Sequence, residues 1–90
     1  MKAARAADST SAVIAQEMGH ILSSDPPEGD RDFFLCGGDS VRAVDLITRL
    51  VERYGGSTDD GGTRLGADLL LALFDDATPQ ALAAVVHEHI

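Results

Sequence analysis

The apolar residues of segment 41–54 recur with the period of an α-helix, and no other feature constrains the fold of this chain as strongly. They fall at positions i, i+3, i+4, i+7 and i+11: Ala43, Leu46, Ile47, Leu50 and Tyr54. At about 100° per residue they share one face. A helix with a single apolar face must bury it against other elements, so the pattern predicts a helix that lines a core.

Segment 10–23 carries a second amphipathic pattern. Its apolar residues follow an i, i+4, i+7, i+8 spacing: Ile14, Met18, Ile21 and Leu22. The run Asp8-Ser9-Thr10 offers an N-cap, so we expect the helix to begin near residue 10 and residues 1–8 to form a flexible tail. Pro26 and Pro27 end the helix because proline lacks an amide donor and disfavours helical backbone in the residue before it.

The rest of the chain predicts two more helices. Residues 55–62 are rich in glycine and lack a large apolar side chain, which favours a mobile surface loop. Residues 69–74 are all apolar, and the helices on either side favour a short helix over a strand. Thr78 followed by Pro79 is a cap with proline at the first helical position, and it begins a last helix that reaches Ile90. No alternating strand pattern and no internal repeat is found.

These segments predict an all-α fold, a small four-helix bundle with three main helices and one short one. Ninety residues, 44% of them hydrophobic, suffice for one core, so residues 1–90 are expected to be a single domain. The long loop between the first two main helices should fold back on that core through Phe33, Phe34 and Leu35. Phe74 and Cys36 are expected to be buried as well.

Charge and cysteine content exclude several classes of function. Seven Lys and Arg against fifteen Asp and Glu give a net charge of -8, which argues against nucleic acid or an anionic membrane and favours protein partners with basic patches. A lone cysteine makes no internal disulfide, and a reducing, cytoplasmic setting is the default. The apolar run 69–74 is far too short to span a membrane, and the N-terminal residues lack the apolar core of a signal peptide. We expect a soluble monomer.

No metal site or catalytic residue is predicted. His87 and His89 are two residues apart and point in different directions on a helix, so surface histidines are the better interpretation. Asp45 and Arg49 are spaced as a helix-stabilising i, i+4 ion pair. No Ser-His-Asp arrangement or Gly-x-Ser-x-Gly turn is evident around Ser40.

The segment that carries chemistry precedes the helix of residues 41–54. Gly37 and Gly38 allow a tight backbone path, Asp39 can cap the helix, and Ser40 is presented at its N-terminus. The partial positive charge and free amides of a helix N-terminus tolerate a phosphate group on the serine hydroxyl. A phosphodiester at Ser40 is therefore favoured.

These residues resemble the peptidyl carrier proteins, or thiolation domains, of nonribosomal peptide synthesis, which belong to the acyl carrier protein-like superfamily. The resemblance lies in the run Asp32-Phe33-Phe34-Leu35-Cys36-Gly37-Gly38-Asp39-Ser40, followed at the third, sixth and tenth positions by Ala43, Leu46 and Leu50. A second match is Leu73-Phe74-Asp75-Asp76-Ala77-Thr78-Pro79. Three features depart from the family pattern: Cys36 in place of leucine, Val41 after the serine, and the glycine-rich loop from Gly55 to Gly66.

The resemblance implies that Ser40 receives 4'-phosphopantetheine from coenzyme A, transferred by a magnesium-dependent phosphopantetheinyl transferase, while the chain itself catalyses nothing. It also implies that an adenylating enzyme loads an amino or aryl acid on the arm as a thioester, for tailoring and condensation enzymes in secondary-metabolite biosynthesis. The start of the chain close to its first helix favours a stand-alone protein over a domain of a synthetase.

Three alternatives remain at this point: an acyl carrier protein of polyketide or fatty-acid type, an acidic helical adaptor without a prosthetic group, and, least favoured, a small enzyme. Within the carrier interpretation, Val41 and Val44 fall at the margin of the core face on the side of Ser40. We expect both valines to be exposed beside the arm as a docking patch, with Arg42 as a polar contact.

Overall fold

The computed structural model describes residues 2–57 and 60–90, with side chains placed for residues 10–56 and 60–90. Its elements in chain order are α1 (Lys2–Leu22), α2 (Ser40–Tyr54), the 3-10 turn η1 (Gly55–Ser57), α3 (Thr63–Asp75) and α4 (Pro79–His89). No strand occurs in these two ranges. The all-α four-helix bundle predicted from the sequence is confirmed.

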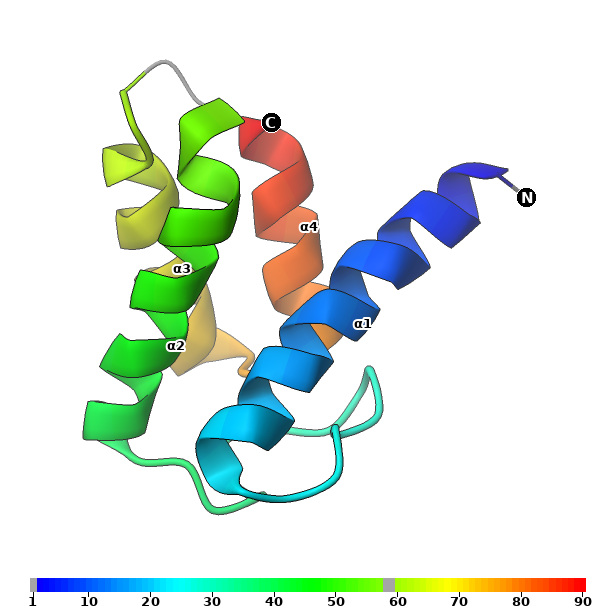
Figure 1. The fold of residues 1–90 in the computed structure, drawn as a ribbon, viewed down its shortest axis with the longest axis vertical. Coiled ribbons are helices and arrows are strands. Elements are labelled where there is room, and N and C mark those ends of the chain that lie inside the picture. The colour runs from blue at the N-terminus through cyan, green and yellow to red at the C-terminus, as the bar shows by residue number, and fades with distance from the viewer. Residues whose placement is uncertain (1, 58–59) are drawn as a thin grey trace.

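The chain runs up α2, down α3 and up α4, while α1 crosses the open side of this group obliquely, with its N-terminal half extending beyond it (Figure 1). The helices in contact are α1 with α4, α3 with α4, α2 with α3, and α1 with α2. The core draws on every helix and on the loops between them: Ile14, Met18, Phe33, Ala43, Leu46, Leu50, Leu65, Leu69, Leu73, Ala77, Leu82, Ala83 and Val86. The predicted apolar face of α2 is confirmed, since Leu46 and Leu50 are fully buried while Ile47 and Tyr54 are partly buried against the core.

The first helix begins earlier than predicted. It starts at Lys2, so the run Asp8-Ser9-Thr10 lies inside the helix instead of capping it, and the expected flexible tail of residues 1–8 is helical from Lys2 onward. Alanine is the strongest helix former, and residues 3–7 contain four alanines, which explains why the helix continues past the polar run.

The third helix is longer than the predicted segment 69–74, because it begins at Thr63. The Asp60 carboxylate accepts hydrogen bonds from the backbone N–H groups of Gly62 (3.2 Å) and Arg64 (3.1 Å), and Gly62 adopts a left-handed φ of 95° that suits glycine. This acidic cap supports a helix start among glycines that otherwise favour a loop. The mobile loop predicted for residues 55–62 falls partly on residues 58 and 59, which lie outside the described residues.

The fourth helix begins where predicted. Thr78 is its N-cap, with Oγ1 accepting a hydrogen bond from the Ala81 N–H at 3.2 Å, and Pro79 is its first residue.

Two of the residues expected in the core are exposed in the loop before α2. Phe33 is fully buried and Phe34 partly so, but Leu35 and Cys36 face solvent. The Asp32 side chain accepts hydrogen bonds from the N–H groups of Phe34 (2.8 Å) and Leu35 (3.3 Å), which winds the backbone into a tight turn. Such a turn directs Phe33 inward and Leu35 and Cys36 outward, so the predicted burial of Leu35 and Cys36 is wrong. The predicted burial of Phe74 on α3 is wrong as well, since its side chain is 66% exposed.

Candidate functional site

Asp39 caps α2, as the sequence predicts. Its extended backbone (φ -138°, ψ -178°) places Oδ1 2.9 Å from the Arg42 N–H, which donates to it, and the Arg42 Nη1 donates to Oδ2 at 2.8 Å. The hydrogen bond from the Arg42 backbone, together with the guanidinium charge, lowers the pKa of the Asp39 carboxyl below its ordinary value of 3.8. Asp39 therefore stays ionised and fixes the first turn of α2.

The two glycines before Asp39 are needed for different reasons. Gly37 has a φ of 109°, a left-handed backbone that side chains disfavour, although nothing lies near its missing Cβ. Gly38 lies against the aromatic ring of Phe33, where a Cβ would be 2.4 Å from Cε2. Together the two glycines allow the backbone to pass close to the buried Phe33 ring and to reach the N-cap of α2.

Ser40 is the first residue of α2 and is exposed. Among the described residues, its hydroxyl forms no hydrogen bond with a histidine or a carboxylate, so none of these residues activates it as a nucleophile. The Arg42 amide is bonded to Asp39, and the half-exposed Arg42 guanidinium forms an ion pair with the same carboxylate. The exposed hydroxyl at the first position of α2 is accessible for covalent attachment of a phosphodiester.

The valines near Ser40 are exposed, as predicted. Val41 is 80% and Val44 59% exposed, which is unusual for large apolar side chains. Arg42 lies between them in sequence but is tied to Asp39 by its ion pair. The structure thus gathers Asp39, Ser40 and the three predicted docking residues in the cap and first turns of α2.

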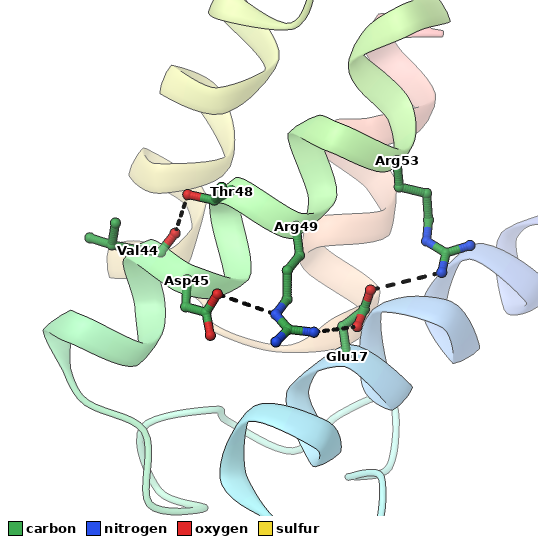
Figure 2. A network of polar contacts seen from close by, with 6 residues as sticks. All are labelled: Glu17, Val44, Asp45, Thr48, Arg49 and Arg53. Carbon is green, nitrogen blue, oxygen red and sulfur yellow. Dashed lines mark hydrogen bonds and ion pairs between the residues drawn. The ribbon is translucent and has the colours of Figure 1, made fainter.

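An ion-pair network lies on another side of α2, where α1 packs (Figure 2). Arg49 contacts Asp45 at 3.2 Å and Glu17 of α1 at 3.4 Å, and Arg53 lies 3.8 Å from Glu17. The hydrogen bond that Arg49 Nε donates to Asp45 Oδ1 is the main cause that raises the pKa of Arg49 above its ordinary value. Figure 2 shows Val44 pointing away from these ion pairs. The Asp45–Arg49 pair is predicted by its spacing, whereas Glu17, 32 residues away, is not.

The histidines do not gather around a metal site. His87 is exposed, and His89 Nε2 lies 2.8 Å from Asp68 Oδ2, which joins α4 to α3. Among the residues that the structure describes, no group of three histidine, cysteine or acidic side chains could hold a metal ion. No described helix is long and apolar enough to cross a membrane.

Comparison with protein families matches residues 12–86 to the family described as "Phosphopantetheine attachment site". The chain belongs to this family. Its members carry a covalently attached 4'-phosphopantetheine group, are not catalytic themselves, and are modified by a phosphopantetheinyl transferase. A search of curated proteins and a search of solved structures found no match.

Proposed function

We propose that this chain is a peptidyl carrier protein that bears its 4'-phosphopantetheine on Ser40 and passes an amino acyl or aryl group between enzymes of nonribosomal peptide synthesis. The observation that carries the assignment of Ser40 is its position: it is exposed, it begins α2, and it directly follows the Asp39 cap. When attached, the arm supplies a terminal thiol that holds the cargo as a thioester.

In the attachment reaction, this chain supplies only the attacking hydroxyl group. Ser40 Oγ forms a bond to the phosphorus that bears pantetheine in coenzyme A, the bond from that phosphorus to adenosine 3',5'-bisphosphate breaks, and the hydroxyl proton passes to a base of the transferase. Asp39 and Arg42 keep the first turn of α2 formed while this happens. The absence of a hydrogen-bonded base beside Ser40, among the described side chains, is consistent with a serine that is a substrate.

The peptidyl subtype is supported by the two glycines and the aromatic pair before Ser40. Gly38 accommodates the ring of Phe33, and Phe34 packs edge-on against that ring with centroids 5.7 Å apart, so these residues of the motif act together. An acyl carrier protein of polyketide or fatty-acid type shares the attachment chemistry and is the second candidate.

The test of attachment is intact mass after incubation with coenzyme A, magnesium and a broad-specificity transferase. We expect a gain of one phosphopantetheine group, lost in Ser40→Ala and kept in Ser24→Ala, a matched change at another exposed serine. No gain, or a gain that survives Ser40→Ala, would defeat the proposal. The modified protein is then offered to adenylating enzymes with a panel of amino and aryl acids. Loading by these enzymes supports the peptidyl type, and loading only by acyltransferases with malonyl groups supports the second candidate.

A further inference from the structure

Cys36 is the only cysteine of the chain, and it is exposed in the loop that leads into α2. Free cysteine is among the residue types most often buried, so an exposed thiol here is unusual. Its N–H donates to the carbonyls of Asp32 at 3.1 Å and Phe33 at 3.2 Å, so the turn that buries Phe33 also fixes the backbone of Cys36. The side chain lines an open groove together with Arg31 and Leu35, where small molecules can reach it.

This thiol lies within reach of the second thiol that attachment at Ser40 brings to the chain. Four residues of fully extended chain span at most about 14 Å, which is an upper limit for the distance between the Cα atoms of Cys36 and Ser40. From phosphorus to sulfur, 4'-phosphopantetheine contains more bonds than the backbone between these two atoms, so its sulfur can reach Cys36. Both ends of the span are fixed, because the turn holds Cys36 and the Asp39 cap holds the start of α2.

We propose that Cys36 forms a reversible disulfide with the thiol of the arm, and that this bond closes the carrier to loading under oxidising conditions. The inference rests on the attachment proposed for Ser40. The oxidant is a low-molecular-weight disulfide such as glutathione disulfide. Cys36 Sγ first exchanges with it, forming a mixed disulfide and releasing one glutathione thiol. Cys36 Sγ then bonds to the arm sulfur, and the second glutathione leaves. Two thiols of the carrier are oxidised, glutathione disulfide is reduced, and both thiol protons end on the two glutathiones.

Ring closure within one carrier should outcompete a disulfide between two carriers. Two groups joined by a short flexible linker have an effective concentration in the millimolar range, about a hundredfold above a protein concentration of about 10 µM. A net charge of -8 on each copy further disfavours the approach of two chains. The flexible arm lets the two sulfurs adopt ordinary disulfide geometry. While the arm sulfur is bonded to Cys36 it cannot hold a thioester, and reduction by a thiol frees it again.

The experiment uses the holo protein, prepared with coenzyme A and the transferase and then fully reduced. It is incubated at about 10 µM with glutathione disulfide at about pH 8, because the thiolate is the reacting form. Intact mass is then measured without reductant. We expect a monomer that has lost two hydrogen atoms, that offers no thiol to iodoacetamide after denaturation, and that regains both thiols with dithiothreitol. Titration against the ratio of reduced to oxidised glutathione should give an effective concentration of about 1 mM or more.

The position of the cysteine is tested by matched variants. Holo Cys36→Ser should form only a mixed disulfide between the arm and glutathione, and the unmodified parent chain should form one only at Cys36. The matched control combines Cys36→Ser with Gly56→Cys, an exposed position beyond the other end of α2 where nothing lies within 4 Å of an added Cβ. Helix α2 alone is about 22 Å long at 1.5 Å per residue, so the effective concentration in this variant should fall about tenfold or more.

Three outcomes would overturn the proposal. The holo protein could gain two glutathione groups in place of the closed ring, or it could form a disulfide-linked dimer. Equal ring formation by the Gly56→Cys variant would remove the role of Cys36's position. The mass gain at Ser40 is measured before oxidation, which separates the two proposals. Without that gain both fail, whereas a holo protein that stays open under glutathione disulfide defeats this proposal alone.

Discussion

Gly38 lies so close to Phe33 that a Cβ at residue 38 would be 2.4 Å from ring carbon Cε2. The Gly38 N–H also donates to the Phe33 carbonyl at 3.0 Å, and the Phe33 N–H donates to the Ala77 carbonyl at 2.8 Å. Through these contacts of Phe33, the segment leading to Ser40 packs on the core and is hydrogen-bonded to the residues just before α4. The position of the exposed serine is set by a contact with a residue seven positions earlier.

Replacing Gly38 with alanine should disrupt the packing of this segment on the Phe33 ring. The methyl group cannot be accommodated unless the Phe33 ring moves, and overpacking of a core commonly costs about 1–3 kcal/mol of unfolding free energy. Urea unfolding measures the loss, and the rate of mass gain with coenzyme A and the transferase should fall as the Ser40 segment shifts. Gly56→Ala is the matched control, since nothing lies within 4 Å of its added Cβ. Equal stability of the two variants would contradict the role given to Gly38.

The parts of the fold that the sequence predicts correctly depend on interactions between residues that are close together in the chain. The period of α2, the Asp39 cap and the Thr78-Pro79 start of α4 depend on residues within a few positions of one another, so each can be deduced from spacing. The clearest errors concern Cys36 and Phe74. Both are apolar, but their burial depends on which way a turn or a helix face points once the other helices are packed, and this is not a local property.

The same distinction between local and non-local interactions applies to the candidate site. Ser40 and its cap are evident from the chain, as is the exposure of Val44 at the margin of a helix face. The contact of Arg49 with Glu17 joins residues 32 positions apart and needs the packing of α1 on α2 to be known. The stacking of Phe74 on Phe34 is equally non-local. No spacing rule on one helix could have indicated either contact.

The C-terminus of α1 offers a test of backbone strain. Ser23 has a φ of 54°, its N–H donates to the His20 carbonyl at 3.3 Å, and the Ser24 N–H donates to the Gly19 carbonyl at 2.9 Å. This is a Schellman cap with serine where glycine is preferred. Ser23→Gly should raise the free energy of unfolding by about 0.5–1 kcal/mol, because glycine adopts the left-handed conformation without strain. Ser24→Gly, whose backbone is not left-handed, should give no gain in the same urea titration.

Asp39 should make stability depend on acid pH. Its pKa is lowered in the folded chain, so the folded state binds its proton less tightly than the unfolded state does. The resulting stabilisation is present above the unfolded pKa and is lost as the pH falls through the folded value, below about 3.8. Thermal unfolding between pH 2 and 7 should therefore show a smaller acid dependence in Asp39→Asn than in the parent. The side-chain carboxyl chemical shift of Asp39 gives the same pKa directly, and an upward shift would refute the prediction.

Glu17 should matter more to stability than Asp45, although both pair with Arg49. Glu17 contacts two arginines and its side chain is only 19% exposed, whereas Asp45 has one partner and is half exposed. Removing Glu17 leaves Arg49 and Arg53 without the contact that joins α2 to α1. Glu17→Gln should lower the urea midpoint more than Asp45→Asn, and the difference should remain in 0.5 M salt because salt screens the half-exposed Asp45 pair more than the partly buried Glu17 pairs. Equal midpoints at low salt would show that the network does not couple the two helices.

Docking beside the arm is tested by Val44→Asp. The Val44 side chain is 59% exposed and points away from the ion pairs that join α2 to α1. The fold should therefore tolerate aspartate at this position, and Ser40 should still be modified. Thioester delivery to a partner enzyme should fall about tenfold, because a charge replaces an apolar contact in a surface meant to be desolvated. Ala84→Asp, at an exposed position on α4, adds the same charge elsewhere and should leave delivery unchanged. Since the docking contact at Val44 is apolar, the rate of thioester delivery by the unmutated protein should change little between low and moderate salt. A steep fall of this rate with salt would instead assign docking to the acidic surface.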